Sequence, residues 1–168
     1  MVLFSGGNDS RRLLELLDAE PVLLTVLSPP AQMELDLIKE LGNGYKHYIA
    51  DYPIETITAY GKKTCIACKA YMYLCAERLA RQIGANAIAT GEIAGSKASQ
   101  TVDNLLFYSR IVNIPVMRPL YGLEKKTYDR VAGAKCDILP RRPATRVRNL
   151  DLGPLKKACK AAKIKPIK

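Results

Sequence analysis

Two short groups of residues in this chain have side chains and a spacing suited to chemistry. The first is the run SGGNDS at residues 5–10, which comes directly after the apolar residues 2–4. Glycine leaves no Cβ in the way of a ligand and allows backbone conformations that are closed to other residues. If a helix begins just beyond the glycines, the amides of residues 6–10 point into one concavity at its N-terminus. That arrangement favours an anion, and phosphate above all.

The glycine run differs from the two commonest phosphate-binding motifs. It lacks the Lys-Ser/Thr end of the usual nucleotide loop, and it lacks the third glycine of the dinucleotide fingerprint. Asp9 adds a carboxylate that can place a magnesium ion or the reacting groups, which makes it a catalytic candidate. The alternative for Asp9 is that it only caps the helix.

The second group is a pair of cysteines, Cys65 and Cys68, spaced i and i+3 at the start of a predicted helix. The spacing puts both thiols on one face, and a helix N-terminus lowers a thiol pKa and favours thiolate. A Cys-x-x-Cys pair serves metal binding, redox exchange or persulfide transfer. Two thiols that merely pack within the protein are the alternative. Because the total of five cysteines is odd, a disulfide framework is not expected.

Apolar runs alternate with helical periodicity along the chain, which predicts an α/β fold with three α/β/α layers and a five-stranded parallel sheet. Ligands bind such sheets beyond the carboxyl ends of the strands, where residues 5–10, 26–30 and 91–100 would converge. The predicted strands are residues 1–4, 21–27, 45–50, 86–90 and 114–120. The predicted helices are residues 10–19, 31–42, 65–83, 99–111, 124–133 and 152–163.

The length of 168 residues predicts one domain, and no apolar run approaches a membrane span. Met1 is followed directly by a predicted strand, with no signal-peptide pattern, so a cytoplasmic protein without membrane contact is expected. We place the catalytic unit at residues 1–140. A basic loop and short helix at residues 141–168 would be appended to the same domain.

Most of the net charge of +10 lies in residues 141–168, which hold ten Lys or Arg against Asp151. A basic segment on a nearly neutral body indicates a polyanionic partner, with RNA the leading candidate. A solubilising tail is the alternative, and only RNA binding would be salt-sensitive. The predicted RNA-binding residues are Arg141, Arg142, Arg146, Arg148, Lys156 and Lys157.

Four segments resemble one enzyme family. Residues 5–10 resemble the SGGxDS signature of the PP-loop ATP enzymes, which have an adenine nucleotide alpha-hydrolase-like (HUP-type) fold. Residues 89–107 (ATGEIAGSKASQTVDNLLF) are similar to the TGExxGQVxSQTxxNL motif of the tRNA 4-thiouridine synthetases, also called thiamine-biosynthesis sulfurtransferases. Residues 118–128 (RPLYGLEKKTY) resemble the RPLxxxDKxxI segment of that family, and SPP at residues 28–30 matches its second-strand loop. The resemblance covers most of residues 1–145.

The resemblance implies an ATP site and a set of residues that line it. Gln100 matches the glutamine of the family motif, with helix capping as the alternative. Ser96-Lys97 departs from the Gln-Val of that motif. The residues implied in ATP binding are Leu3, Phe4, Ser5, Gly6, Gly7, Asn8, Asp9, Ser10, Val26, Leu27, Lys69, Gly91 and Gln100.

A third cysteine, Cys136, matches the place of the family's persulfide-carrying cysteine. Relatives without a rhodanese domain have CxxC plus this downstream cysteine, and three such cysteines hold an iron–sulfur cluster. The resemblance therefore implies that Cys65, Cys68 and Cys136 act together, as ligands of a [4Fe-4S] cluster or as a persulfide relay. Cys75 is expected to be core packing, and Cys159 has no assigned role.

The implied reaction is ATP-dependent tRNA thiolation that uses Mg²⁺. AMP is transferred to O4 of a uridine, and sulfur then replaces it at C4 to give 4-thiouridine. The implied partners are tRNA, a sulfide or persulfide donor, and a separate THUMP-containing protein, because this chain has no room for the family's RNA-gripping modules. A homodimer would help one small domain to hold a large RNA. The alternatives are adenylation of another base or small-molecule carbonyl, or a nucleotide-binding subunit of a tRNA-modifying complex.

Overall fold

A six-stranded sheet forms the centre of the computed structural model, which describes residues 1–124, 126–133, 136, 146–147 and 149–167. The strand order is β5-β4-β1-β2-β3-β6, and all neighbours are parallel except β6, which runs antiparallel to β3. The strands are β1 (Val2–Leu3), β2 (Leu23–Val26), β3 (His47–Ala50), β4 (Ile88–Thr90), β5 (Val116–Met117) and β6 (Ile164–Pro166).

The prediction of five strands was wrong by one. The sixth strand, β6, has only three residues, and its Lys and Pro do not form an apolar run. It pairs with the edge of β3, where Ala50 lies opposite Ile164, and the amide of Ile167 donates a 2.8 Å hydrogen bond to the carbonyl of His47. An edge strand needs only one hydrogen-bonded neighbour, so its sequence signal is weak.

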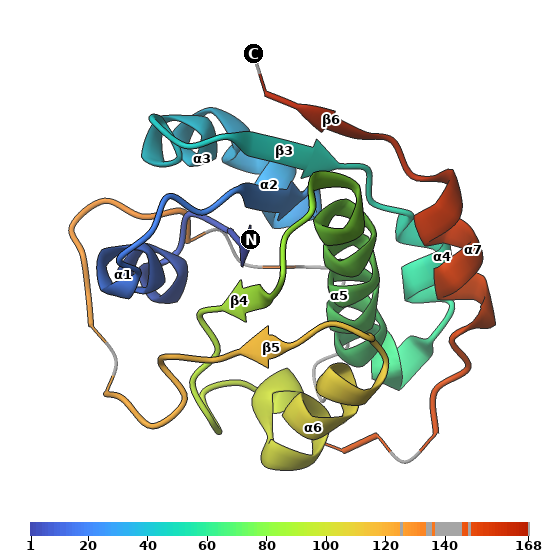
Figure 1. Ribbon diagram of the computed structural model, residues 1–168. Helices are drawn as coiled ribbons and strands as arrows, with labels where there is room; N and C mark the ends of the chain where they lie inside the picture. Colours follow the sequence, from blue (N-terminus) through green and yellow to red (C-terminus); the bar gives the residue numbers. More distant parts are fainter. Residues whose placement is uncertain (125, 134–135, 137–145, 148, 168) are drawn as a thin grey trace.

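Helices cover both faces of the sheet, as the three-layer prediction requires (Figure 1). With the sheet seen nearly edge-on, α1 and α3 lie to the left, and α4, α5 and α7 lie to the right. The α-helices are α1 (Asn8–Leu16), α2 (Pro29–Met33), α3 (Leu35–Leu41), α4 (Ile54–Thr58), α5 (Thr64–Ile83), α6 (Val102–Arg110) and α7 (Gly153–Ala161). Two short 3-10 helices are η1 (Gly61–Lys63) and η2 (Ala98–Gln100).

Strand β2 shows how the two cores divide. All four of its residues are buried, as a continuous apolar strand covered on both faces should be. Leu24 and Val26 pack into the core formed with α5, whereas Leu23 packs into the core that contains Leu13 of α1. Because successive strand residues point to opposite faces, a single apolar run supplies both layers.

Two predicted helices were wrong. Residues 31–42 form two helices, α2 and α3, which are separated at Glu34. Helix α2 begins earlier than expected because Pro29 suits a first helical position, where its missing N–H costs nothing. Residues 124 and 126–133 contain no helix. They run across α1 and α3 instead, with Arg130 paired to Glu40 at 2.5 Å.

The basic C-terminal part packs on the same domain. Helix α7 lies against α5, and the Arg78 guanidinium donates a 2.9 Å hydrogen bond to the carbonyl of Ala162 at the end of α7. The Tyr60 hydroxyl donates to the carbonyl of Asp151. The boundary proposed at residue 140 lies outside the described residues. Among the described helices, none is both long and apolar enough to cross a membrane.

Candidate active site

The glycine turn between β1 and α1 has the conformation that its sequence predicts. Gly6 has a φ of +69°, a region that other residues rarely adopt. A Cβ on Gly6 would also lie 3.0 Å from side-chain atoms of Ala132 and Ile38. The carbonyl of Gly6 accepts a 2.9 Å hydrogen bond from the amide of Ala132. These contacts therefore hold the turn against the segment that follows β5.

Helix α1 begins directly after this turn, with Gly7 at its N-cap and no side chain capping it. The capping alternative for Asp9 is therefore wrong, and Asp9 lies in the first turn of α1. The Ser10 hydroxyl donates to the carbonyl of Gly7 at 3.0 Å and lies 3.4 Å from the amide nitrogen of Ser5. These contacts close the turn without using the Asp9 carboxylate.

Gly91, at the end of β4, packs directly on the first turn of α1. A Cβ at this position would lie 2.6 Å from the carbonyl oxygen of Asp9 and 3.0 Å from the amide nitrogen of Ser10. No side chain fits at those distances. Gly91 thus holds the β4 loop against the glycine turn, in addition to bordering the adjacent cavity.

Two adjoining cavities lie at the carboxyl ends of the parallel strands. The smaller cavity, of about 240 Å³, is bordered by the ends of β1, β2 and β4 and by α5. The larger cavity, of about 600 Å³, lies between the glycine turn and the described residues 131–133 and 136. The predicted nucleotide residues that border one or both are Leu3, Phe4, Ser5, Gly7, Asn8, Asp9, Ser10, Val26, Lys69, Gly91 and Gln100. Gly6 and Leu27 border neither cavity in the described structure.

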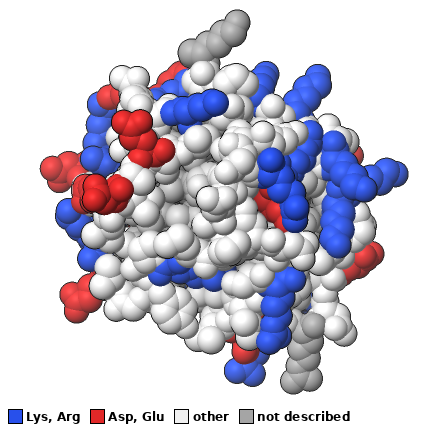
Figure 2. Space-filling view, in the orientation of Figure 1, with Lys and Arg blue, Asp and Glu red and all other residues white. Residues whose placement is uncertain are grey.

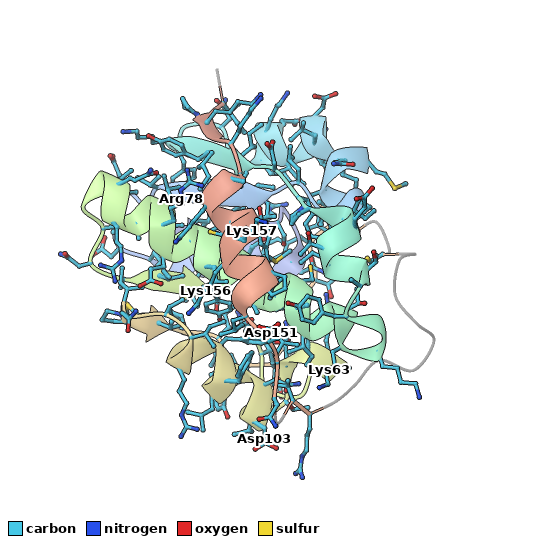
Figure 3. The ribbon with its side chains drawn as sticks, turned by 90° about the vertical axis from the view of Figure 1, so that its right-hand side faces the viewer. Lys63, Arg78, Asp103, Asp151, Lys156 and Lys157 are labelled. Atoms are coloured by element: carbon cyan, nitrogen blue, oxygen red, sulfur yellow. The ribbon has the colours of Figure 1, made fainter. Side chains whose placement is uncertain are left out.

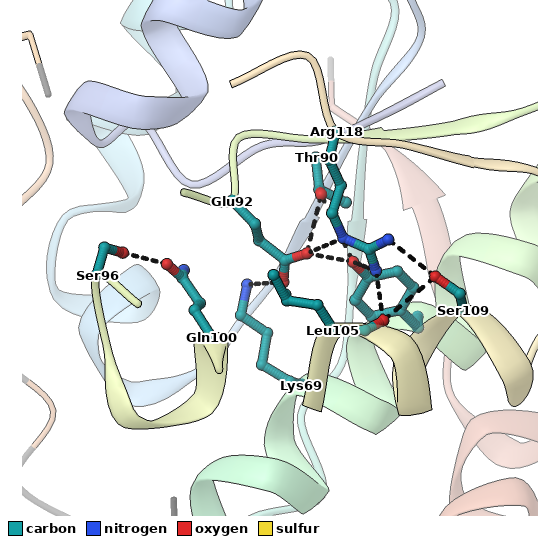
Figure 4. A network of polar contacts seen from close by, with 9 residues as sticks. Lys69, Thr90, Glu92, Ser96, Gln100, Leu105, Ser109 and Arg118 are labelled. Carbon is teal, nitrogen blue, oxygen red and sulfur yellow. Dashed lines mark hydrogen bonds and ion pairs between the residues drawn. The ribbon is translucent and has the colours of Figure 1, made fainter. Parts of the chain in front are cut away.

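A buried carboxylate, Glu92, borders the smaller cavity and lies at the centre of a network of polar contacts (Figure 4). Its Oε1 lies 3.1 Å from the ammonium nitrogen of Lys69. Its Oε2 accepts hydrogen bonds from Thr90 at 3.0 Å, from Arg118 at 2.9 Å and from the Tyr73 hydroxyl. Burial alone would raise the pKa of Glu92, but its charged and hydrogen-bonding partners outweigh burial and hold the pKa below its usual value.

Arg118 connects this network to α6. Its guanidinium donates to Ser109 Oγ at 2.8 Å and to the carbonyl of Leu105 at 3.0 Å. Every partner of Glu92 is thus held by a further contact or by its own strand or helix. The orientation of Lys69 at the cavity wall depends on a network of side chains from α5, β4, α6 and the segment after β5.

Gln100 is buried at the end of η2 and borders the smaller cavity. Its amide oxygen is bonded to the Ser96 hydroxyl (Figure 4). The N-cap of α6 is Thr101, whose side chain accepts from the amide of Asn104, so the capping alternative for Gln100 is wrong.

The three candidate sulfur residues lie on two segments. Cys65 and Cys68 are half-buried in the first two turns of α5, and Cys136 borders the larger cavity together with the glycine turn. Burial raises the pKa of Cys68 to about 11, and burial together with the neighbouring Cys136 raises the pKa of Cys65. The expectation of a lowered thiol pKa at the start of this helix is therefore wrong, because burial raises the pKa of both thiols.

No metal-binding cluster of three His, Cys, Asp or Glu side chains is present in the described part of the chain. Cys75 is fully buried in the core, as predicted. Its sulfur lies 3.7 Å from that of Cys159, so the cysteine left unassigned packs against Cys75 between α5 and α7. His47 is buried in β3, where its Nε2 lies 2.8 Å from Thr25 Oγ1.

Comparison with known proteins decides the family. The model of a family described as thiamine biosynthesis protein (ThiI) matches residues 44–152. This chain belongs to the ThiI family.

Curated relatives of this ThiI-family chain are named as sulfurtransferases. A probable tRNA sulfurtransferase of Methanobrevibacter smithii is 36% identical over 112 residues, which are 60% of this chain and 29% of the relative. One of Methanosarcina acetivorans is 32% identical over a match that covers 90% of this chain and 44% of the relative. The chain thus spans less than half the length of either relative.

A solved structure shares the fold. The crystal structure of a 4-thiouridine synthetase–RNA complex with bound ATP matches 99% of this chain and 55% of its own, with a TM-score of 0.68 and 24% identity. The likeness supports the mostly parallel PP-loop architecture described above.

The predicted RNA-binding residues of this ThiI-family chain are only partly described. Lys156 and Lys157 are exposed on α7, on a face that also carries Lys63 and Asp151 (Figure 3). Lys and Arg gather on the right-hand side of Figure 2, where α7 lies. Arg146 is exposed and paired with Asp103 at 2.8 Å. Arg141, Arg142 and Arg148 lie outside the described residues.

Sequence reasoning missed several residues of the site. Glu92 and Arg118 lie inside the motifs that identify the family, but neither was assigned a role. Tyr73 lies in the middle of α5, where its place in the helix gives no sign of a contact with Glu92. Lys97 was noted only as a departure from the motif, yet it borders both cavities. The signal available for Glu92 was a charged residue directly after a buried strand.

Proposed function

We propose that this chain is the adenylating and sulfur-transferring part of an ATP-dependent tRNA thiolation enzyme. The observation that carries the proposal is that the glycine turn and Cys136 border one cavity. A phosphate-binding turn and a candidate sulfur carrier thus face the same space. Family membership and the sulfurtransferase relatives support the assignment.

The nucleotide would lie across both cavities. The smaller one has apolar walls from Leu3, Leu24 and Val26, which suit an adenine ring. The larger one begins at the glycine turn, whose backbone amides and α1 N-terminus suit phosphates. Asp9 borders both, and one carboxylate together with nucleotide phosphates is a usual magnesium environment. A bound Mg²⁺ would neutralise charge that develops on departing pyrophosphate.

The reaction has two balanced steps. First, uridine O4 forms a bond to the α-phosphorus, and the bond from that phosphorus to pyrophosphate breaks. Second, the outer sulfur of a persulfide on Cys136, loaded by a persulfide donor, forms a bond to C4 while the C4–O4 bond breaks, so that AMP leaves with the former uridine oxygen and the persulfide proton goes to solvent. To complete this step, the thiol of Cys65 or Cys68 attacks the Cys136 sulfur and forms a disulfide with it, which breaks the sulfur–sulfur bond and leaves the outer sulfur on C4, and an external thiol then reduces the disulfide. The glycine turn positions the phosphates for the first step, and the thiols of Cys65, Cys68 and Cys136 deliver sulfur for the second.

The thiol arrangement supports a persulfide relay over a [4Fe-4S] cluster. The described residues hold no three-ligand cluster, so the fit to an iron–sulfur cluster is poor and no step is routed through one. We propose sulfur transfer through Cys136, with Cys65 and Cys68 beside it. Anaerobic purification with iron and sulfide analysis tests this choice, and stoichiometric iron in active enzyme would overturn it.

The substrate proposed is tRNA, held in part by the exposed lysines of α7, in a cytoplasmic setting. The decisive assay supplies ATP, a persulfide donor, a thiol reductant and unmodified tRNA, with and without a separate THUMP-containing protein, and measures thionucleoside and pyrophosphate. The proposal expects both products. ATP binding without pyrophosphate release would favour a nucleotide-binding subunit, and pyrophosphate release with a different acceptor would favour another carbonyl substrate. The homodimer remains a prediction.

A further inference from the structure

Lys97 lies where the two cavities meet. It borders both, on the loop between β4 and η2. Few described residues do so, and the others come from the glycine turn, α1, the connection after β2, and α2: Ser5, Asp9, Ser28 and Ala31. Of the described residues shared by the two cavities, Lys97 alone carries a positive charge.

The loop fixes the position of Lys97 through hydrogen bonds. The carbonyl of Lys97 accepts from the amide of Gln100 at 2.8 Å, and the amide of Gly95 donates to the carbonyl of Gln100 at 2.9 Å. The side-chain amide of Asn104 donates to the carbonyl of Ala98 at 3.0 Å. The backbone of this lysine is thus placed by the β4–α6 connection, and its side chain is exposed toward the cavities.

Among the described residues, the ammonium group of Lys97 has no ion-pair partner, so it is available to bind a ligand. Lysine is the only basic residue type that borders the cavities in the described structure, at positions 69, 97 and 126. The ammonium of Lys69 is 3.1 Å from Glu92, and that of Lys126 is 2.9 Å from Glu15. Within the described residues Lys97 has no ion pair. An unpaired lysine beside a phosphate-binding turn favours an anionic ligand.

The position of Lys97 indicates which phosphate of the nucleotide its ammonium group would contact. If adenine occupies the smaller cavity and the outer phosphates lie at the glycine turn, the phosphate next to the ribose lies at the junction. We propose that Lys97 binds the α-phosphate, both in ATP and in the adenylated intermediate. This inference rests on the proposed function, and it assigns to the chain a contact that the family motif, with Val at this position, does not predict.

The neighbourhood of the thiols agrees with this position. Burial and the proximity of Cys136 raise the pKa of Cys65, while the positive charge of Lys97 acts in the opposite direction. Lys97 is therefore near the sulfur residues as well as the glycine turn. The α-phosphate must lie there too, because it is bonded to the oxygen that sulfur displaces.

The test compares the affinities of ATP, AMP and adenosine for four forms of the chain by calorimetry without tRNA. The forms are wild type, Lys97→Val, Lys97→Arg, and the control Lys165→Val on the exposed face of β6. Lys97→Val should weaken ATP and AMP binding by about tenfold each, the usual effect of removing one charge-assisted hydrogen bond. Adenosine binding should not change, Lys97→Arg should recover most of the affinity, and the control should match wild type.

The outcomes separate this inference from the proposed function. A folded wild type that binds no ATP overturns the nucleotide site, and the role of the lysine with it. A wild type that binds ATP while Lys97→Val binds ATP and AMP equally well overturns only the assignment of Lys97. Weaker binding of ATP with unchanged binding of AMP places the lysine at an outer phosphate and also overturns the assignment.

Discussion

The ammonium nitrogen of Lys69 lies 3.1 Å from Oε1 of Glu92, a carboxylate that is almost completely buried. The pair joins the wall of the smaller cavity to the interior, because Oε2 of the same carboxylate is held by Arg118, Tyr73 and Thr90. A side chain that borders a ligand cavity contributes to binding only if it is held in the right orientation. The buried contacts of Glu92 hold Lys69 in one orientation.

Glu92→Gln should therefore destabilise the protein and weaken ATP binding together. Removing the charge leaves the guanidinium of Arg118 without its counter-charge in a mostly buried place, and breaking a buried pair costs about 3 kcal/mol. Urea unfolding measures this change in stability. The matched control is Asp36→Asn, which removes an exposed pair with Lys39 and should change stability little. Equal stability of Glu92→Gln and wild type would contradict the network's role.

His47 makes stability depend on pH. Burial lowers its pKa from 6.5 to about 4, so the folded protein keeps the ring neutral while the unfolded chain takes up a proton below pH 6.5. The stabilising contribution is complete above pH 6.5 and is lost as pH falls toward 4. Wild type should lose about 2 kcal/mol between pH 7 and 5.

One substitution removes the histidine contribution to this pH effect, because the chain has a single histidine. His47→Gln should be less stable at pH 7 but should lack most of the decrease in stability between pH 7 and 5. Chemical unfolding at several pH values measures both slopes. The same slope in the variant would show that another group is responsible.

Gly91→Ala should impair the site by displacing the glycine turn. The added methyl would lie 2.6 Å from the Asp9 carbonyl oxygen, so the first turn of α1 must move. ATP affinity should fall at least about tenfold, since small displacements of binding groups are costly. Gly122→Ala is the control, because a Cβ there meets nothing within 4 Å. Wild-type ATP affinity in Gly91→Ala would show that the close approach has no functional role.

The exposed lysines of α7 provide a separate test of RNA binding. Replacing Lys156, Lys157 and Lys160 by Ala should weaken tRNA binding and reduce the slope of log affinity against log salt, by about one for each phosphate that is no longer neutralised. ATP affinity should stay the same. A charge-matched control removes Lys39, Lys46 and Lys165, which are exposed on other parts of the chain. Equally weakened tRNA binding in both triple variants would indicate an effect of net charge and not a docking face.

Local patterns in the sequence predicted the elements that carry the chemistry. The glycine turn, α5 and the buried strands have signals confined to neighbouring residues, and the structure contains each of them. Residues 124–133 have a helical pattern, but the described part of this segment forms no helix, because its contacts are tertiary. Tyr128 donates its amide to Asn8 Oδ1 at 3.0 Å, a partner that no local pattern reveals.

From the sequence, the candidate site could be predicted only at residues that belong to recognisable motifs. The cavity residues near 5–10 and 91–100 follow strand ends, where parallel sheets place ligands. The Glu92 network joins residues 73, 92 and 118, which are far apart in sequence and have different neighbours. The thiol pKa values were predicted in the wrong direction because the helix N-terminus is visible in sequence whereas burial is not.

In the proposed function, one cavity couples ATP cleavage at the glycine turn to sulfur delivery from Cys136. A single assay measures pyrophosphate and thionucleoside together for wild type and Cys136→Ala, with ATP, a persulfide donor, a thiol reductant, tRNA and a THUMP-containing partner. Wild type should form one pyrophosphate per thionucleoside. Cys136→Ala should still release pyrophosphate when tRNA is present but should form almost no thionucleoside. Full thionucleoside formation by Cys136→Ala would show that sulfur does not pass through Cys136.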